Sequence, residues 1–145
     1  MQIQISEAIH SVLIVEDEMI VALLIEDLVR ELGVRNVYIC PDIDSALDTV
    51  RTEQIDCAIL DLRLRDRDSM PVADALEAKG IPFVFSSGSD SGAIAPRHAA
   101  RPLISKPFLD DDLKLVVLDT WTLAQSQRPA EMGAGQRVAP FIATD

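Results

Sequence analysis

Short apolar runs alternate with longer amphipathic stretches along most of the chain. The run 11–15 is an example, because it is too brief for a helix and apolar at nearly every position. Continuous apolar runs of this length are typical of strands that are buried on both faces of a sheet. We expect five such strands, at 11–15, 37–40, 56–60, 81–86 and 103–105.

Between these runs, apolar residues recur at the three- and four-residue spacing of a helix. Gly33 and Gly80 fall where two of the stretches end, as expected for residues that close a helix. We expect helices at 19–32, 44–51, 71–79 and 110–124. The apolar stripe of the first helix is expected at Ile20, Leu24, Leu28 and Leu32.

The last expected helix opens with three aspartates, 110–112, a favourable charge at a helix N-terminus. Trp121 lies on the apolar stripe of this helix, so we expect it to be packed against the sheet.

The order of these elements indicates one α/β domain. Strands that alternate with helices predict a doubly wound parallel sheet with helices on both faces. The segment 87–102 is rich in Gly, Ala, Ser and Pro, so the fourth helix expected there is poorly specified. We assign 1–10 to an N-terminal extension, 11–125 to the folded domain and 126–145 to a flexible tail rich in Pro and Gly.

Composition and charge narrow the classes of partner. The chain has 145 residues, of which 48% are hydrophobic and 26% charged, a globular balance. Its net charge of −11 disfavours nucleic acid and anionic membranes as partners. No apolar run approaches the roughly 20 residues of a membrane helix, and the first residues do not resemble a signal peptide. We therefore expect a cytoplasmic protein.

The two cysteines are expected to be reduced. Cys40 and Cys57 each fall within a predicted strand. If those strands flank the first one, their backbones lie about 9–10 Å apart. A disulfide requires Cα atoms within about 7 Å, so two buried thiols are the better interpretation.

Polar side chains follow four of the predicted strands. Glu16 and Asp17 follow the first strand, Asp61 follows the run of the third, Ser87 follows the fourth and Lys106 follows the fifth. A parallel sheet gathers the carboxyl ends of its strands at one edge, where ligand sites form. Carboxylates that meet there repel one another, and a hard cation such as Mg²⁺ relieves that repulsion.

These side chains suffice for the transfer of a phosphoryl group onto a carboxylate. Asp61 would be the nucleophile, and Glu16, Asp17, Asp61 and the backbone carbonyl of Arg63 would hold Mg²⁺. Lys106 would bind one phosphoryl oxygen, and the Ser87 hydroxyl would donate a hydrogen bond to it. Such a reaction depends mainly on positioning and charge neutralisation.

Two enzyme classes fit the sequence less well. A phosphatase of the haloacid-dehalogenase type also uses an aspartate and Mg²⁺, but it needs a second aspartate two residues later, where this chain has Arg63. A P-loop kinase is excluded because the chain has no glycine-rich loop with a GK[ST] sequence.

Several charged residues are given ordinary roles. We expect Arg63, Arg65 and Arg67 to lie in a solvated loop, with Arg63 alternatively modulating water access to a phosphorylated Asp61. His10 and His98 lack partners at metal-ligand spacing, so we expect surface or loop histidines.

The chain resembles the receiver domain of two-component response regulators. The resemblance lies in Val15-Glu16-Asp17, Leu60-Asp61, Ser87-Gly88 and Lys106-Pro107-Phe108. It implies a flavodoxin-like fold with strand order 2-1-3-4-5, an acidic pair at Glu16 and Asp17, and a phosphoacceptor at Asp61. It further implies a switch hydroxyl at Ser87, the lysine at Lys106 and a cis peptide bond before Pro107. The implied protein is a Mg²⁺-dependent phosphorelay component and not a conventional enzyme, because it catalyses only its own phosphorylation and dephosphorylation. Its implied donors are a histidine kinase or a histidine phosphotransfer protein.

A narrower resemblance covers 71–76 and 80–88. These stretches are similar to a stand-alone receiver subgroup with a Pro-Phe-x-Phe-Ala-Thr-Gly-Gly-Tyr motif, in which Ser86-Ser87 here replaces Ala-Thr and Ser89-Asp90 the final Gly-Tyr. This implies a single-domain regulator that signals through protein contacts or onward phosphotransfer, in the stress-response phosphorelays associated with that subgroup. Leu103 stands where receivers usually carry Tyr or Phe. The alternative is therefore a phosphorylation-independent pseudo-receiver that acts as an interaction module.

Overall fold

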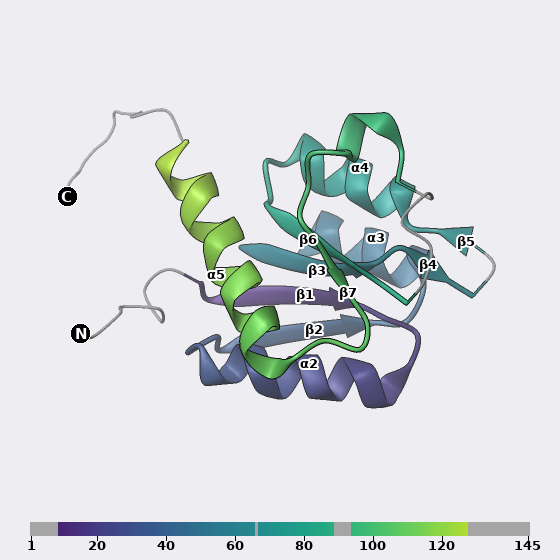
Figure 1. The fold of residues 1–145 in the computed structure, drawn as a ribbon. Coiled ribbons are helices and arrows are strands. Elements are labelled where there is room, and N and C mark those ends of the chain that lie inside the picture. Colours follow the sequence, from purple (N-terminus) through teal and green to yellow (C-terminus); the bar gives the residue numbers. More distant parts are fainter. Residues whose placement is uncertain (1–8, 66, 89–93, 128–145) are drawn as a thin grey trace.

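A parallel five-stranded sheet forms the centre of the molecule in the computed structural model, which describes residues 9–65, 67–88 and 94–127 (Figure 1). Its strands lie in the order β2-β1-β3-β6-β7, and every neighbouring pair is parallel. Counted along the sheet strands alone, this is the expected order 2-1-3-4-5. The strands are β1 (Ser11–Val15), β2 (Asn36–Cys40), β3 (Cys57–Asp61), β6 (Phe83–Ser87) and β7 (Leu103–Ser105).

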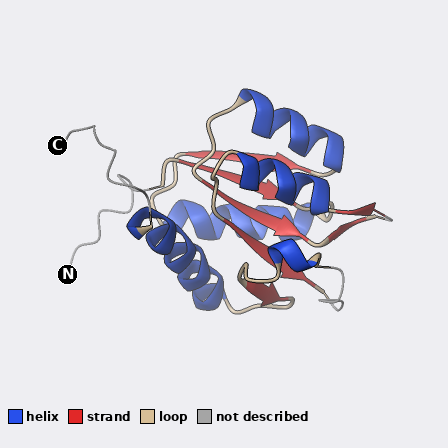
Figure 2. Ribbon diagram, turned by 90° about the horizontal axis from the view of Figure 1, so that it is seen from above, coloured by secondary structure: helices blue, strands red, loops and turns tan. Residues whose placement is uncertain are grey.

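Helices cover both faces of this sheet, as expected for a doubly wound fold (Figures 1 and 2). The helices are α2 (Met19–Glu31), α3 (Ile43–Thr52), α4 (Met70–Ala78) and α5 (Asp110–Ser126). Alternate residues of β1 divide between two apolar clusters: Val12 and Ile14 pack with α2 and α5, whereas Leu13 and Val15 pack with α3 and α4. Every residue of β1 is buried, because both faces of the strand are covered. Trp121 packs in the first of these clusters, as predicted.

The expected apolar stripe of α2 was wrong. Ile20 is 85% exposed and Leu24 is 42% exposed, whereas Leu28 is buried. The buried residues of the helix are Ala22, Ile25, Leu28 and Val29. All residues from 19 to 25 are apolar, so the sequence offers several possible stripes and only packing against the sheet selects one.

A small antiparallel hairpin occupies the segment expected to be a solvated loop. It consists of β4 (Arg63–Leu64) and β5 (Arg67–Asp68), with Leu64 opposite Arg67. Leu64 is only 3% exposed and anchors the hairpin to the core, so the arginines beside it remain exposed while the backbone is fixed.

His98 lies in the segment that connects β6 and β7, in agreement with the loop alternative expected from sequence, but it is buried and not at the surface. It lies at the end of a short 3₁₀ turn (Pro96–His98), in place of the fourth helix, and is 2% exposed. Its Nε2 lies 2.7 Å from Oδ1 of Asp74, and its ring contacts Phe83 and Phe85 edge-on. The Asp74 carboxylate satisfies one ring nitrogen, whereas the buried Nδ1 has no hydrogen-bond partner and lies 4.0 Å from Oε1 of Glu77.

Both cysteines are free and buried, as predicted. β2 and β3 lie on either side of β1, so Cys40 and Cys57 are separated by a whole strand. Burial raises the pKa of the Cys57 thiol to about 12, so this group stays protonated at neutral pH.

The chain termini are described in part. Most of the expected N-terminal extension and nearly all of the expected tail, 1–8 and 128–145, lie outside the described residues. Ile9 is fully buried and belongs to the core, and α5 continues to Ser126. Within the described segments, none of the helices has the length and apolar character that crossing a membrane requires.

Candidate functional site

The carboxyl ends of β1 and β3 bring three acidic side chains together. The two strands are neighbours, with Val15 opposite Leu60, so Glu16 and Asp17 come to lie beside Asp61. One carboxylate oxygen from each of the three lies within 4.8 Å of the others. The structure therefore assembles the acidic group at the sheet edge where the sequence placed it.

Lys106 joins two of these carboxylates. Its Nζ donates to Oε1 of Glu16 at 2.7 Å and to Oδ2 of Asp61 at 3.1 Å. The residue follows β7, its backbone amide donates to the carbonyl of Ser87 at 2.8 Å, and the peptide bond to Pro107 is cis. Sequence placed Lys106 at the same edge but gave no sign that it bridges Glu16 and Asp61.

The electrostatics of this group depend on its burial. The Glu16 side chain is 1% exposed, and the loss of hydration raises its pKa even though Lys106 hydrogen-bonds to it. Burial disfavours the Lys106 ammonium as well, but its contacts with Glu16 and Asp61 outweigh that cost and raise its pKa. Lys106 is therefore positively charged between two acidic groups.

Backbone amides hold the remaining carboxylate oxygens. The amide of Arg65, on the turn of the β4–β5 hairpin, donates to Oδ2 of Asp17 at 3.0 Å. The amide of Glu18 donates to the second oxygen of Glu16 at 3.1 Å. Sequence reasoning missed the role of the hairpin, because a contact between residues 48 positions apart leaves no local pattern.

A hollow of about 340 Å³ opens above Asp61. The residues around it include every predicted site residue except Glu16, which lies beneath and holds Lys106. Those residues are Asp17, Glu18, Asp61, Leu62, Arg63, Arg65, Ser87, Gly88 and Lys106. Ser87 is mostly buried at the end of β6 and lines the same hollow as Lys106.

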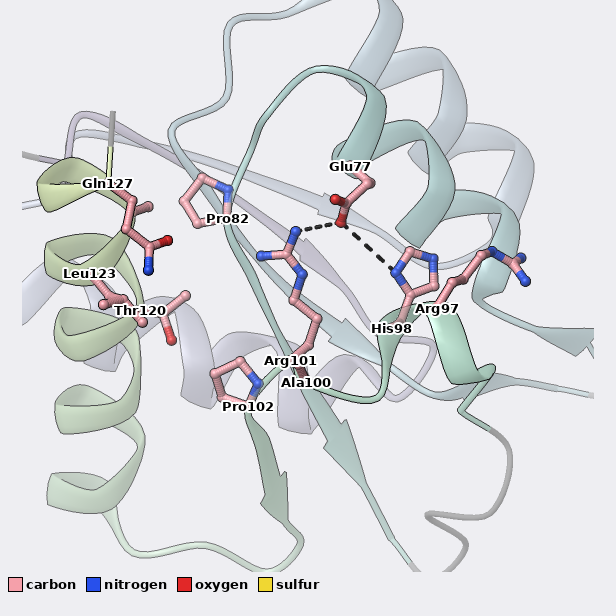
Figure 3. A pocket seen from close by; sticks show the side chains of 11 residues that line it. Glu77, Pro82, Arg97, His98, Ala100, Arg101, Pro102, Thr120, Leu123 and Gln127 are labelled. Atoms are coloured by element: carbon pink, nitrogen blue, oxygen red, sulfur yellow. Dashed lines mark hydrogen bonds and ion pairs between the residues drawn. The ribbon is translucent and has the colours of Figure 1, made fainter. Parts of the chain in front are cut away.

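A second hollow of about 430 Å³ lies near the amino ends of β6 and β7, beside α5 (Figure 3). Its charged groups already have partners: Arg101 contacts Glu77, and Arg97 makes a two-point contact with Asp74. Hydrogen bonds from these arginines lower the pKa of both carboxyls. The buried Nδ1 of His98 and the hydroxyl of Thr120 lack hydrogen-bond partners in this hollow. Among the described residues, however, the acidic group that could hold a metal ion lies at the hollow above Asp61, which is therefore the candidate site.

Comparison with known proteins gives one family. The sequence model of one protein family, the response regulator receiver domain, matches residues 12–118 of this chain. Regulatory protein LuxO from Vibrio vulnificus strain YJ016 is 30% identical over 134 residues, which are 88% of this chain and 29% of that protein. The chain thus spans less than a third of that curated relative.

Solved structures show the same fold. SdrG from Sphingomonas melonis Fr1 has a TM-score of 0.70 and 38% identity, over 79% of this chain and 98% of that one. The receiver domain of sensor histidine kinase PA1611 from Pseudomonas aeruginosa PAO1 has a TM-score of 0.68 and 21% identity, over 79% and 99% of the two chains. That structure has a magnesium ion coordinated in its active-site cleft.

Proposed function

The chain belongs to the response-regulator receiver domain family, and on this premise we propose that Asp61 is its phosphoacceptor. Receiver domains accept a phosphoryl group in two-component signalling, which is the function of this family. In the proposed reaction, a carboxylate oxygen of Asp61 forms the new bond to phosphorus. The bond from phosphorus to the donor breaks, and its electron pair leaves with the donor.

The contact of Lys106 with both Asp61 and Glu16 is the observation that carries this assignment. It fixes a cation within 3.1 Å of the proposed nucleophile, at the border of an open hollow. A phosphoryl group that enters the hollow brings negative charge, and the ammonium neutralises part of it. Ser87 lines the same hollow, and on this proposal its hydroxyl would donate a hydrogen bond to a phosphoryl oxygen.

The three carboxylates fit a hard divalent cation, because oxygen ligands at this spacing are what Mg²⁺ prefers. Glu16, Asp17, Asp61 and the carbonyl of Arg63 would hold Mg²⁺, which when bound neutralises charge on the phosphoryl oxygens. Within the described residues, Lys106 forms ion pairs with Glu16 and Asp61 but not with Asp17, so a divalent cation would add positive charge to this group.

We further propose a stand-alone regulator that comprises residues 11–125 as its receiver. A histidine kinase or a histidine phosphotransfer protein would be its donor, and it would signal in the cytoplasm through protein contacts or onward phosphotransfer. Support comes from the motif in 71–88 and from SdrG, 98% of whose solved chain is matched. On this proposal the chain catalyses only its own phosphorylation and dephosphorylation.

Intact-mass measurement after incubation with acetyl phosphate and Mg²⁺ tests the proposal. We expect a gain of one phosphoryl group in the natural protein and none in Asp61→Asn. A gain that persists in Asp61→Asn would overturn the assignment of Asp61.

The alternative is a pseudo-receiver whose partners do not depend on phosphorylation. It is favoured by Leu103, an aliphatic and partly exposed residue on β7 at the position where the family usually carries an aromatic. A folded protein that gains no mass with acetyl phosphate and Mg²⁺ would support this alternative.

A further inference from the structure

Three exposed arginines stand at the border of the candidate site. They are Arg63, Arg65 and Arg67 of the β4–β5 hairpin, residues 63–68, which we call the arginine hairpin. Arg63 and Arg65 line the hollow above Asp61, whereas Arg67 lies outside its lining. The protein carries a net charge of −11, whereas these three side chains are positively charged.

These arginines lack strong partners within the described residues. Arg30, Arg51, Arg97 and Arg101 each contact a carboxylate directly. By contrast, Arg63 and Arg65 make no ion pair among the residues that the structure describes. Arg67 lies 3.9 Å from Asp44, and both side chains are more than half exposed, so that contact contributes little.

The nearest described carboxylate on the hairpin is already engaged. Asp68 stands opposite Arg63, but its Oδ1 accepts a hydrogen bond from the amide of Met70 at 3.0 Å, at the start of α4. Hydrogen bonds from Ser45 and, more weakly, the charges of Arg65 and Arg67 lower the pKa of Asp42. Because neither Arg63 nor Arg65 forms a direct ion pair within the described residues, we infer that their guanidinium groups are available to an outside carboxylate.

The described residues of the arginine hairpin, 63–65 and 67–68, are held by backbone and core contacts. Leu64 is buried, the two short strands pair, and the amide of Arg65 donates to Asp17. Arg65 itself has a φ of 61°, in the left-handed region that costs a residue other than glycine about 1–2 kcal/mol. Strain of this kind next to a reactive site points to a function for the side chain.

We propose that the arginine hairpin recognises acidic side chains around the phosphodonating histidine of a protein donor. This inference rests on the proposed function, because it assumes that a protein passes its phosphoryl group to Asp61. Guanidinium groups bind carboxylates at two points, which gives both attraction and orientation. Arg67 lies outside the hollow and pairs with Leu64, whereas Arg63 pairs with Asp68, so contact with all three arginines requires a surface wider than the hollow, such as that of a protein.

Charge complementarity also sets the expected kinetics. Asp17, Glu18 and Asp61 line the same hollow as Arg63 and Arg65, so the region is of mixed charge. The exposed guanidinium groups at its border would raise the rate of association with an acidic partner, and salt would weaken the effect. The net charge of −11 works against a long polyanion such as nucleic acid but less against a few carboxylates beside the site.

A charge-reversal experiment tests the proposal. The probes are one phosphorylated histidine phosphotransfer domain with acidic residues around its histidine, and its variant with those residues changed to lysine. At low salt we expect the natural protein to be phosphorylated about tenfold faster by the acidic form, with the difference shrinking at high salt. The variant Arg63→Glu/Arg65→Glu/Arg67→Glu should reverse this preference.

Two further variants separate charge from folding and from position. Arg65→Gly removes one charge and suits the left-handed backbone, so we expect slower transfer from the acidic donor without loss of stability. Arg35→Glu is the matched control. Arg35 is exposed and makes no ion pair among the described residues. It directly precedes β2, so it lies at the amino end of that strand, away from the carboxyl ends that form the site. It should leave the donor preference unchanged.

Acetyl phosphate distinguishes the two possible failures. If it does not phosphorylate Asp61 in the natural protein, the proposed function fails. If it does, and the charge-reversed variant keeps the same donor preference as the natural protein, the inference about the arginine hairpin alone is overturned. Arg67→Glu should keep its rate with acetyl phosphate, since Arg67 does not line the hollow.

Discussion

Glu16 is a buried carboxylate whose counter-charge comes from a distant residue. Its side chain is 1% exposed, and Lys106 supplies the ammonium that contacts it. A buried charge that loses its partner is far more costly than the pair, because its lost hydration is no longer offset.

We therefore expect Lys106→Met to destabilise the protein by about 3 kcal/mol in the presence of EDTA. Urea unfolding followed by circular dichroism measures this change. The double variant Glu16→Gln/Lys106→Met is the control and should recover much of the loss, because Glu16, the more buried of the two carboxylates that contact Lys106, is then neutral. Equal stabilities of Lys106→Met and the natural protein would contradict the description of the pair.

At the level of single residues, the sequence indicated which strand ends would meet more reliably than it indicated which side chains would be buried. Each of the site positions follows an apolar strand, and a parallel sheet brings such positions together whatever the details of packing. His98 could not be placed in this way, because the residue that makes its burial tolerable, Asp74, lies on another element.

The helix α2 shows how an element can be predicted while its orientation is missed. Its bounds agree with expectation to within one residue at the C-terminal end, but the face that packs on the sheet differs. Two isoleucines on this helix, Ile20 and Ile25, now have opposite environments, at 85% and 0% exposed.

The matched substitutions Ile20→Ala and Ile25→Ala should therefore differ sharply. We expect Ile25→Ala to lower the free energy of unfolding by about 3 kcal/mol, because it leaves a cavity in the core. Ile20→Ala should change it by less than about 0.5 kcal/mol. Urea titration of both variants provides the comparison, and equal losses would show that the helix packs through a different face.

The elements α4 and the 3₁₀ turn are joined by a charged contact that should respond to acid. Hydrogen bonds from Arg97 and His98 lower the pKa of Asp74, so this carboxylate stabilises the folded state while it is ionised. With a folded pKa below the unfolded one, that contribution is present above about pH 4 and is lost as the pH falls further.

We expect Asp74→Asn to be less stable than the natural protein at neutral pH, with the difference shrinking as the pH falls below about 4. Urea unfolding at several pH values gives the two curves. Asp48→Asn, which alters an exposed pair on α3, serves as the control and should run nearly parallel to the natural protein. A constant gap between Asp74→Asn and the natural protein would rule out this linkage.

The hairpin and the 3₁₀ turn were not predicted because neither depends on a local pattern. The strands of the hairpin have two residues each. Asp17 accepts a hydrogen bond from the amide of Arg65 at the turn, and the carbonyl of Leu62 accepts one from the amide of Ser69 at the base. The five strands and four helices, by contrast, follow from runs of apolar residues that need only a sheet to cover.

At the scale of the whole molecule, the acidic site links cation binding to folding. Glu16, Asp17 and Asp61 come from two strands, so the group exists only in the folded chain. A cation that binds the folded state alone stabilises it by mass action, by about 2.7 kcal/mol at a hundred times its dissociation constant.

We expect the melting temperature to rise with added Mg²⁺, as measured by differential scanning calorimetry. Asp17→Asn should lose most of this rise, because one of the three carboxylates is neutralised. Asp27→Asn changes an exposed residue of α2 and should keep the rise in melting temperature. A rise of the same size in Asp17→Asn would mean that the ion binds elsewhere.

The bridge between Lys106 and Glu16 joins residues 90 positions apart, and this has a consequence for the timing of synthesis. A contact that spans so much of the chain can form only after Lys106 has left the ribosome, by which time β1, β3 and β6 have already been made. A partly made chain therefore presents its acidic strand ends without the ammonium that balances them. On the proposed function, a growing chain would not be phosphorylated by its donor until β7 and the Lys106 that follows it have been made.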